Sequence, residues 1–156
     1  MDDAQASARL KLPSGGLAYY VAAIRECFEE VGLLLASPRA GAPLDPATVA
    51  RIVHDERRRM HAGECTFLDI LERYDLVLAT DQIEYIAHWN TMAGRPRRFT
   101  TRFFLTVAPA DHDAVHDASE TVDTVWIRPA DALAASDAGD MELMHPTFKT
   151  LQGLAA

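Results

Sequence analysis

The sequence predicts one domain of the α/β or α+β class, and three observations support this. Apolar residues recur at helical spacing in residues 17–31, two further helical segments cover about 46–60 and 66–74, and polar and apolar residues alternate in 83–89 and 99–107. Spacings of three and four are typical of amphipathic helices, and strict alternation is typical of half-buried strands. The order of these elements differs from the alternating strand and helix units of a Rossmann fold.

Length and composition fit a single globular domain. The chain has 156 residues, of which 49% are hydrophobic and 24% charged. A chain of this size buries a sizeable core but is too short to divide comfortably into two domains. We therefore expect one domain, residues 1–156, and one functional site.

Charge and cysteine content restrict the partners and the compartment. The formal net charge of -8 argues against nucleic acid as the main partner, which requires a basic surplus, and is compatible with binding of divalent cations. Cys27 and Cys65 show no metal-ligand spacing and indicate a reduced, cytoplasmic setting. The acidic start MDDAQASARL does not resemble a secretory signal, and no apolar run reaches membrane-spanning length. We expect no membrane partner.

The first third of the chain is predicted to contain two helices. A short helix is expected over residues 3–10, after an aspartate that caps its N-terminus. The sequence PSGG at 13–16 then interrupts the helical structure. The second helix runs over about 17–31, and Gly32 is well placed as the residue that ends it. This second helix has the most regular apolar face in the sequence.

The middle of the chain is predicted to form a loop and a pair of helices. Residues 37–46 are rich in Pro and Ala and read as a loop. Asp45 and Pro46 are a good N-cap and first-turn pair for a helix that ends near Met60, and Thr66 caps the next helix. The two helices carry a strongly charged face.

The last part of the chain is predicted to begin with a β-hairpin. The alternating segments 83–89 and 99–107 form its strands, with the turn at 90–96. A further strand is expected over about 121–127, with Trp126 packed in the core, followed by a short helix over 129–135 and a last helix over 146–154.

The helix over 17–31 carries three carboxylates close together. Glu26 precedes Glu29 by three positions and Glu30 by four, so all three project from one side of the helix. Like charges at this spacing cost a few tenths of a kcal/mol per pair, whereas a bound Mg²⁺ or Mn²⁺ would make the arrangement favourable. Arg25, four positions before Glu29, can orient that carboxylate. The alternative is a solvated acidic helix face with one ion pair.

The string RECFEEVGL at residues 25–33 resembles the second half of the Nudix box, R-E-U-x-E-E-x-G-U, in which U is apolar. It matches every specified position when Cys27 is counted as apolar. The resemblance implies a Nudix-type α/β/α sandwich with a mixed sheet and a helical insertion at residues 46–75. It also implies a hydrolase that uses Mg²⁺ or Mn²⁺ to cleave the diphosphate of a nucleoside diphosphate derivative.

The resemblance also implies roles for particular residues. Glu26, Glu29 and Glu30 are the expected metal ligands. Nudix hydrolases often take a further acidic ligand from a loop before a strand that carries a tryptophan, and Glu120, six residues before Trp126, fits this place. Asp117 and Asp123 are alternatives to Glu120. The expected catalytic residues are Glu26 and Arg25, with Glu26 as general base unless a carboxylate from a later loop takes that role.

The first half of the Nudix box does not match. Its glycine and glutamate positions are occupied by Lys11 and Leu17, and about three strands that usually precede the helix are missing, because only 16 residues come before Leu17. We therefore expect the N-terminal strands to be absent or reduced and residues 1–16 to form an atypical or truncated start. A second copy of the chain would cover the exposed sheet edge, which predicts a homodimer.

Three features resemble the Nudix branch of peroxisomal coenzyme A diphosphatases and their bacterial relatives: the phrases AAIRECFEE and PRRFTTRFF, and the helical insertion. The implied substrate is coenzyme A or acyl-coenzyme A. Arg98 and Arg102 lie four residues apart on one face of the predicted strand and are candidate phosphate contacts, although arginines on an edge strand also serve solubility. The alternative function is a catalytically impaired Nudix fold that binds a nucleotide or regulates a partner.

Overall fold

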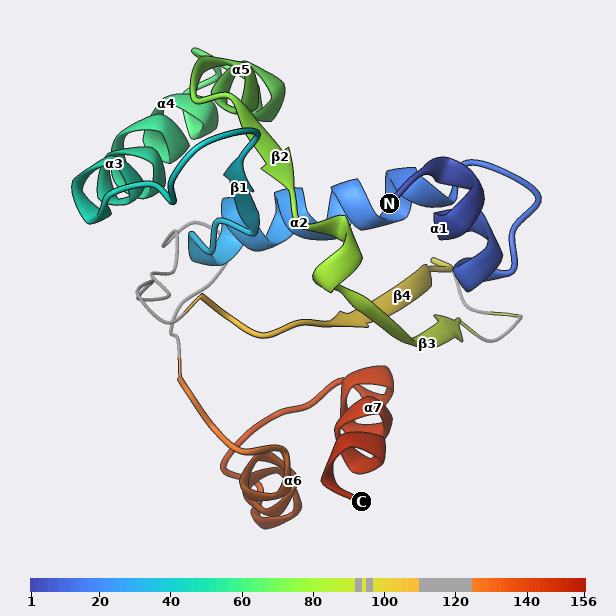
Figure 1. Cartoon of the computed structure of the whole chain (residues 1–156). Coiled ribbons are helices and arrows are strands. Elements are labelled where there is room, and N and C mark those ends of the chain that lie inside the picture. The colour runs from blue at the N-terminus through green and yellow to red at the C-terminus, as the bar shows by residue number, and fades with distance from the viewer. Residues whose placement is uncertain (92–93, 95–96, 110–124) are drawn as a thin grey trace. The chain divides into compact units, whose positions relative to one another are not determined.

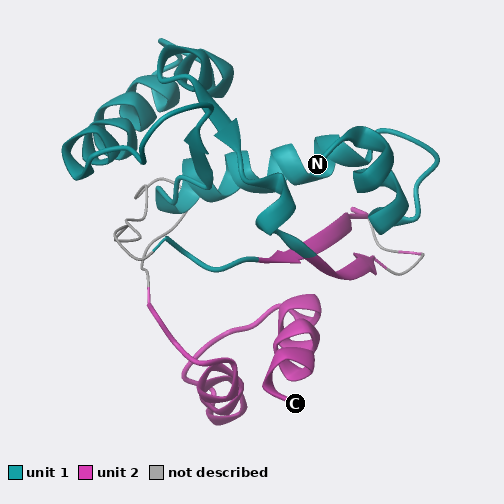
Figure 2. Cartoon of the chain, viewed as in Figure 1, with its two compact units in different colours: residues 1–84, 106–124 teal, residues 85–105, 125–156 magenta. Residues whose placement is uncertain are grey.

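The structure is a computed structural model, and it describes residues 1–156 with the exception of 92–93, 95–96 and 110–124. The chain divides into two compact units, one made of residues 1–84 and 106–124, the other of residues 85–105 and 125–156 (Figure 2). The first unit contains the predicted Nudix helix and the helical insertion. Each unit is described separately below.

The first unit begins with two helices packed against each other, α1 (Asp3–Leu10) and α2 (Gly16–Val31) (Figure 1). Asp2 caps α1 through a capping box with Gln5, as the sequence predicts. The helices cross closely at Gly16, where a Cβ atom would lie 2.3 Å from the backbone nitrogen of Ser7. Glycine is therefore required at this crossing.

A short ladder follows α2. β1 (Ala36–Pro38) pairs antiparallel with β2 (Leu76–Leu78), with Ala36 opposite Leu78. The sequence prediction of a loop over 37–46 is therefore wrong at its first two residues. A strand of three residues is too short to show the alternation by which strands are recognised.

The helical insertion lies between β1 and β2. It consists of α3 (Pro46–Arg51), the π-helical turn η1 (Ile52–Glu56), α4 (Arg57–His61) and α5 (Phe67–Arg73). Asp45 and Thr66 accept hydrogen bonds from backbone amides of the first turns of α3 and α5, which confirms both predicted N-caps. The π turn is a feature that the sequence does not predict.

The core of the first unit is built on the inner face of α2. Tyr20, Ile24 and Phe28 are fully buried, together with Ile52 and Ile70 of the insertion. The rings of Phe28 and Phe67 lie 5.5 Å apart between centroids. Burial of each large side chain stabilises the fold by roughly 1.5–3 kcal/mol, so α2 is firmly held by its inner face.

The second unit contains the predicted hairpin and the C-terminal helices. After the 3-10 turn η2 (Thr80–Gln82) of the first unit, β3 (Glu84–Asn90) pairs with β4 (Thr100–Leu105). α6 (Pro129–Ala138) packs on α7 (His145–Ala155). Trp89 of β3 donates a hydrogen bond of 3.2 Å to Thr150 Oγ1 of α7, which joins the hairpin to the last helix.

One predicted strand is not observed where the structure can test it. Residues 121–124 of the predicted strand 121–127 lie outside the described residues, and 125–127 adopt no regular structure. The prediction that Trp126 packs in the core is wrong, because 70% of its surface is exposed. Strand propensity is realised only where a neighbouring strand offers a partner, and this part of the chain has none among the described strands.

The predicted α/β class and the reduced set of strands are confirmed. The sheets of the described residues are two pairs of strands, β1 with β2 and β3 with β4. Within the described residues, no helix has the length and hydrophobicity needed to cross a membrane.

Candidate active site

The predicted site lies on the outer side of α2, in its second half. Ile24 and Phe28 on the opposite side are fully buried, whereas Arg25 and Glu26 are exposed and Glu29 is about one quarter exposed. The helical spacing that buries the apolar residues thus turns the charged ones outward. The anchored inner face gives these side chains a fixed backbone.

Arg25 contacts two of the three predicted carboxylates. Its Nη2 atom forms an ion pair with Glu26 Oε1, and its Nη1 atom lies 3.2 Å from Glu29 Oε1. These side chains are a quarter to a half exposed, so each pair contributes about 1 kcal/mol or less. Such weak pairs can open when another cation competes for the carboxylates. The predicted contact between Arg25 and Glu29 is present.

Cys27 occupies an apolar position of the Nudix box. Burial raises the pKa of the Cys27 thiol, and the negative charge of Glu30 raises it further. The thiol therefore stays neutral at physiological pH and behaves as a small apolar side chain. This is the physical reason why cysteine can replace an apolar residue here.

The end of α2 is held by Arg57, a residue from the strongly charged part of the insertion. Arg57 is buried, and its Nε and Nη2 atoms donate hydrogen bonds to the carbonyl oxygen of Glu29 at 3.0 and 2.9 Å. Nη2 also donates to the carbonyl oxygen of Glu30 at 2.8 Å. In the sequence Arg57 belongs to the charged run DERRR, and no feature of this run distinguishes a buried arginine from an exposed one.

Glu56, next to Arg57, is buried as well. Arg73 Nη1 donates to both its carboxylate oxygens at 2.6 Å, and Tyr74 Oη donates to Oε1 at 3.1 Å. Arg59 Nη1 adds an ion pair at 2.8 Å. Burial raises the pKa of the Glu56 carboxyl, but the hydrogen bonds and charges of these partners outweigh it, and the pKa lies below its ordinary value. This network joins α4 to α5. The strongly charged face of the insertion is therefore buried at Glu56 and Arg57.

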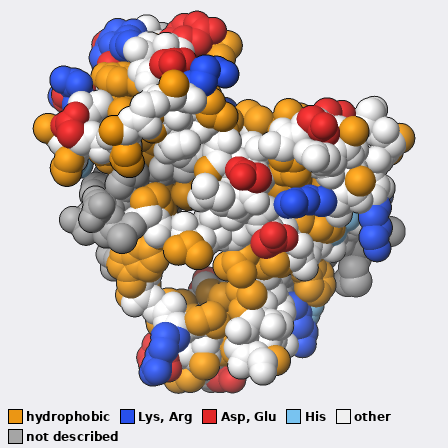
Figure 3. Space-filling model, viewed as in Figure 1, with side chains coloured by type: hydrophobic (Ala, Val, Ile, Leu, Met, Phe, Trp, Pro, Cys, Tyr) orange, Lys and Arg blue, Asp and Glu red, His pale blue; other side chains and the backbone are white. Residues whose placement is uncertain are grey.

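Other charged residues of the insertion lie on its surface. Arg58 and Asp55 form an exposed pair at 3.7 Å, and acidic and basic side chains are interspersed over the insertion (Figure 3). Interspersed charges of both signs are typical of a solvated surface. The charged run therefore has a buried side and an exposed side.

The donor set on α2 suits a hard divalent cation. Carboxylate oxygens are the ligands that Mg²⁺ and Mn²⁺ prefer, and three of them project from one helix side. Among the residues that the structure describes, no group of three or more His, Cys, Asp or Glu side chains converges tightly enough to hold an ion. Instead, the guanidinium of Arg25 forms ion pairs with both Glu26 and Glu29. The chemistry fits, and metal binding would require these side chains to turn away from Arg25.

The other predicted site residues lie outside this group. Glu120 and its alternatives Asp117 and Asp123 fall outside the described residues. Arg98 is exposed and precedes the first residue of β4, whereas Arg102 is half-buried within it, so the two do not share one regular strand. Both belong to the second unit, and their role as phosphate contacts stays a prediction.

A cavity lies in the first unit next to the end of α2. Its volume is about 460 Å³, and the described residues that line it carry no charge. They are Leu34, Ala36, Ser37, Pro38, Gly41, Pro43, Leu44, Pro46, Val49 and Pro109. Leu34 comes four residues after Glu30. The cavity can take an apolar group, and the sequence analysis did not identify it.

Comparison with known proteins identifies relatives. The NUDT19 Nudix domain family matches residues 1–154. The acyl-coenzyme A diphosphatases NUDT19 of Gallus gallus and Homo sapiens are each 28% identical, over 152 and 151 residues, and the matches cover 88% and 89% of this chain. They cover 40% and 39% of the relatives, so the chain spans about two fifths of their length. The crystal structure of a Nudix hydrolase from Alicyclobacillus acidocaldarius superposes with a TM-score of 0.70 at 26% identity, over 86% of this chain and 60% of that one.

Proposed function

The chain belongs to the NUDT19 Nudix domain family, and on this premise we propose that it is a metal-dependent hydrolase. It cleaves the diphosphate of a nucleoside diphosphate linked to another group, with coenzyme A or acyl-coenzyme A as substrate. The observation that carries the proposal is the group of Glu26, Glu29 and Glu30 on the outer side of a helix whose inner side is fully buried. Such a helix presents its carboxylates from a rigid base.

In this proposal Glu29 and Glu30 hold Mg²⁺ or Mn²⁺, with Glu120 or a neighbouring acid. The cation supplies neutralisation of charge on the diphosphate oxygens and a lower pKa for water. Glu26 accepts the proton of the attacking water, or serves as a further metal ligand, and its 49% exposed side chain allows either role. Arg25, which pairs with Glu26 and Glu29, would face the negative diphosphate if these carboxylates held a cation.

The proposed substrate class has two supports. The curated relatives are named acyl-coenzyme A diphosphatases, and the cavity beside β1 is lined by uncharged residues. An uncharged wall disfavours a phosphate and favours an apolar chain. We propose that the acyl part of the substrate occupies this cavity. Arg98 and Arg102 remain proposed phosphate contacts.

Turnover of a substrate panel tests the proposal. Hydrolysis of coenzyme A, an acyl-coenzyme A and several dinucleotides is measured with Mg²⁺ and with Mn²⁺. We expect turnover with these metals, and we expect it to stop when the metal is removed by a chelator. The variant Val49→Asp places a charge in the cavity and should lower kcat/KM for the acyl-coenzyme A more than for coenzyme A. An equal loss on both substrates would remove the cavity from the substrate site.

The second candidate is a Nudix fold that binds a nucleotide without hydrolysing it. Lys11 and Leu17, at the positions where the full motif has Gly and Glu, favour this reading. Saturable binding of a panel member without turnover in either metal would support it over the hydrolase.

We further propose that residues 1–156 act as one Nudix domain in the cytoplasm and associate as a homodimer. Each described sheet has two strands and therefore edges that another strand can pair with. Sedimentation at micromolar concentration should show a dimer. A monomer with full hydrolytic activity would contradict the expectation.

A further inference from the structure

The last turn of α2 carries the two predicted metal ligands Glu29 and Glu30, and their backbone carbonyls need partners. Carbonyls in the last turn of a helix have no partner within the helix. The carbonyl of Phe28 accepts a hydrogen bond from Gly32 N at 3.0 Å. The carbonyls of Glu29 and Glu30 instead accept three hydrogen bonds from Arg57, at 2.8 to 3.0 Å. One side chain of the insertion thus holds the peptide groups of both candidate ligands.

Residues at the end of α2 and residues of the insertion both shape the contact between Arg57 and the Glu29 and Glu30 carbonyls. Gly32 has φ +70°, and a Cβ atom on it would lie 3.2 Å from Arg57 Nη1 and 3.1 Å from Val53 Cγ1. Val53 and Arg57 are four residues apart and both face the end of α2. Val53 belongs to the π turn Ile52–Glu56 and Arg57 directly follows it, and such turns change which residues of a helix face its neighbour. Glycine at position 32 gives the guanidinium room to approach.

Other groups at this end of α2 were considered. His61 Nε2 lies 3.1 Å from the same Glu29 carbonyl but is exposed, so water competes for its contact. Glu56 is engaged by Arg59, Arg73 and Tyr74. Among the residues that the structure describes, Arg57 is the buried cation in contact with the Glu29 and Glu30 peptides.

We propose that Arg57 is a positioning residue for the metal ligands Glu29 and Glu30, and this rests on the proposed function. Its planar guanidinium fixes the two adjacent peptide groups from which these side chains extend. Its charge also offsets the partial negative charge of the helix C-terminus, which lies beside three carboxylates. Arg57 touches neither metal nor substrate, and it acts through the orientation of the two glutamates.

The test compares Arg57→Lys and Arg57→Met with the matched control Arg58→Met, whose parent side chain is exposed and makes a 3.7 Å pair with Asp55. Mn²⁺ affinity is measured by calorimetry without substrate, and kcat and KM are measured separately. We expect Arg57→Lys to fold and to bind Mn²⁺ about 10–100-fold more weakly, as partners of metal ligands do when changed. The catalytic rate should fall more than KM changes, and the control should match the wild type.

A second variant perturbs the contact from the other side. Gly32→Ala places a methyl group against Arg57 and should weaken Mn²⁺ binding in the same direction. If Arg57→Lys and Gly32→Ala fold and melt at lower temperatures but bind Mn²⁺ with wild-type affinity, the inference is overturned. Arg57 would then only stabilise the C-terminus of α2. A wild-type chain that neither binds Mn²⁺ nor hydrolyses any substrate would overturn the proposed function together with this inference.

Discussion

The carboxylate of Asp3 caps a helix to which it does not belong: its Oδ1 atom accepts a hydrogen bond of 2.9 Å from the backbone nitrogen of Leu17 in α2. Oδ2 accepts another from Gly15 N, also at 2.9 Å. The residue at the start of α2, Gly15, has no side chain to cap it. Asp3 therefore satisfies amides at the N-terminus of the helix that carries the candidate site.

Asp3→Asn should lower the melting temperature of the protein above pH 4. Hydrogen bonds from Leu17 and Gly15 lower the pKa of the Asp3 carboxyl below its ordinary value. A lowered folded-state pKa contributes stability above the unfolded value, and this is lost as the pH falls through the folded value. The difference between wild type and variant, measured by thermal unfolding from pH 2 to 7, should shrink at the acid end. A difference independent of pH would contradict the capping role of the charge.

Gly16→Ala should separate α1 from α2 and destabilise the protein by about 1–3 kcal/mol, because the added methyl group overlaps the backbone of Ser7. The control is Gly153→Ala in α7, where a Cβ atom would meet nothing within 4 Å. That change should leave stability equal or raise it by about 0.5–1 kcal/mol. Denaturant unfolding measures both, and equal effects would show that the crossing tolerates a side chain.

Glu56→Gln should destabilise the insertion by about 1–3 kcal/mol, the range for a buried group that loses its charged hydrogen bonds. The exposed Glu64→Gln serves as control, since Glu64 makes a single pair with Arg59 at 3.2 Å. The pKa of Glu56 is lowered, so its contribution is fully present above the ordinary value of 4.5 and is lost as the pH falls through the lower folded-state pKa. Unfolding measured from pH 7 to pH 2 should show the largest effect of the variant at pH 7 and a shrinking effect at the acid end.

Glu29→Gln and Glu30→Gln should each abolish most turnover, because each removes a proposed metal ligand. Neither change should unfold the protein, because these side chains lie outside the buried core. Glu26→Gln should lower the catalytic rate and leave Mn²⁺ binding largely intact if Glu26 is the general base. A matching loss of Mn²⁺ affinity would make it a ligand instead. Wild-type rates in both Glu29→Gln and Glu30→Gln would place the metal site elsewhere.

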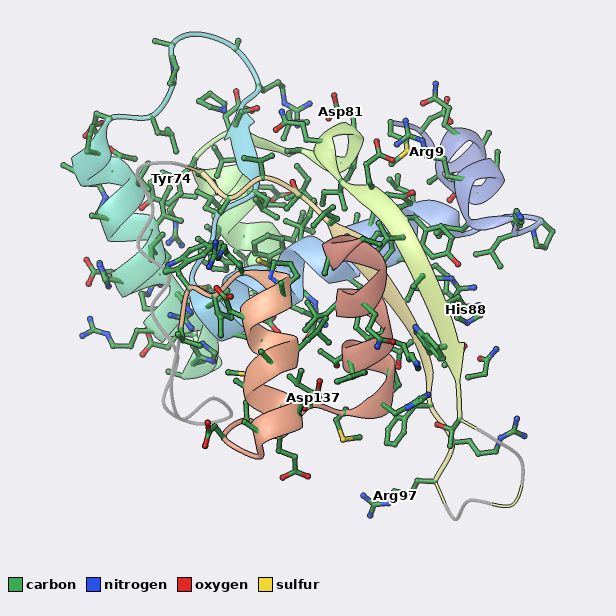
Figure 4. All side chains as sticks on the ribbon, turned by 90° about the horizontal axis from the view of Figure 1, so that it is seen from below. Arg9, Tyr74, Asp81, His88, Arg97 and Asp137 are labelled. Atoms are coloured by element: carbon green, nitrogen blue, oxygen red, sulfur yellow. The ribbon has the colours of Figure 1, made fainter. Side chains whose placement is uncertain are left out.

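Arg98→Ala should raise KM for coenzyme A severalfold while kcat changes little, because a remote phosphate contact stabilises the ground state and the transition state alike. Arg97→Ala is the matched control, since Arg97 is exposed and extends away from the ribbon at the connection between β3 and β4 (Figure 4). Identical kinetics for Arg98→Ala, Arg97→Ala and wild type would remove Arg98 from the site.

Local signals determined the elements and the family. The apolar spacing in residues 17–31 predicts α2, Gly32 predicts its end, and Asp45 and Thr66 predict two N-caps. The run from Arg25 to Leu33 identifies the Nudix superfamily, and the NUDT19 Nudix domain match agrees with it. These features depend on neighbours within one or two helical turns, so they can be read from the sequence alone.

Contacts between distant segments were decided by the tertiary structure. Asp3 accepts a hydrogen bond from Leu17 N across the loop that joins α1 to α2, and Arg57 donates to the Glu29 carbonyl, 28 positions away in the sequence. Nothing in the charged run DERRR marks its first arginine, Arg57, as buried, because burial depends on the packing of the insertion against α2 and on the room left by Gly32. The short pairing of β1 with β2 joins segments about 40 residues apart and likewise leaves no periodic signal. A sequence pattern records which face of an element is apolar, whereas the partner that covers that face is set by the fold.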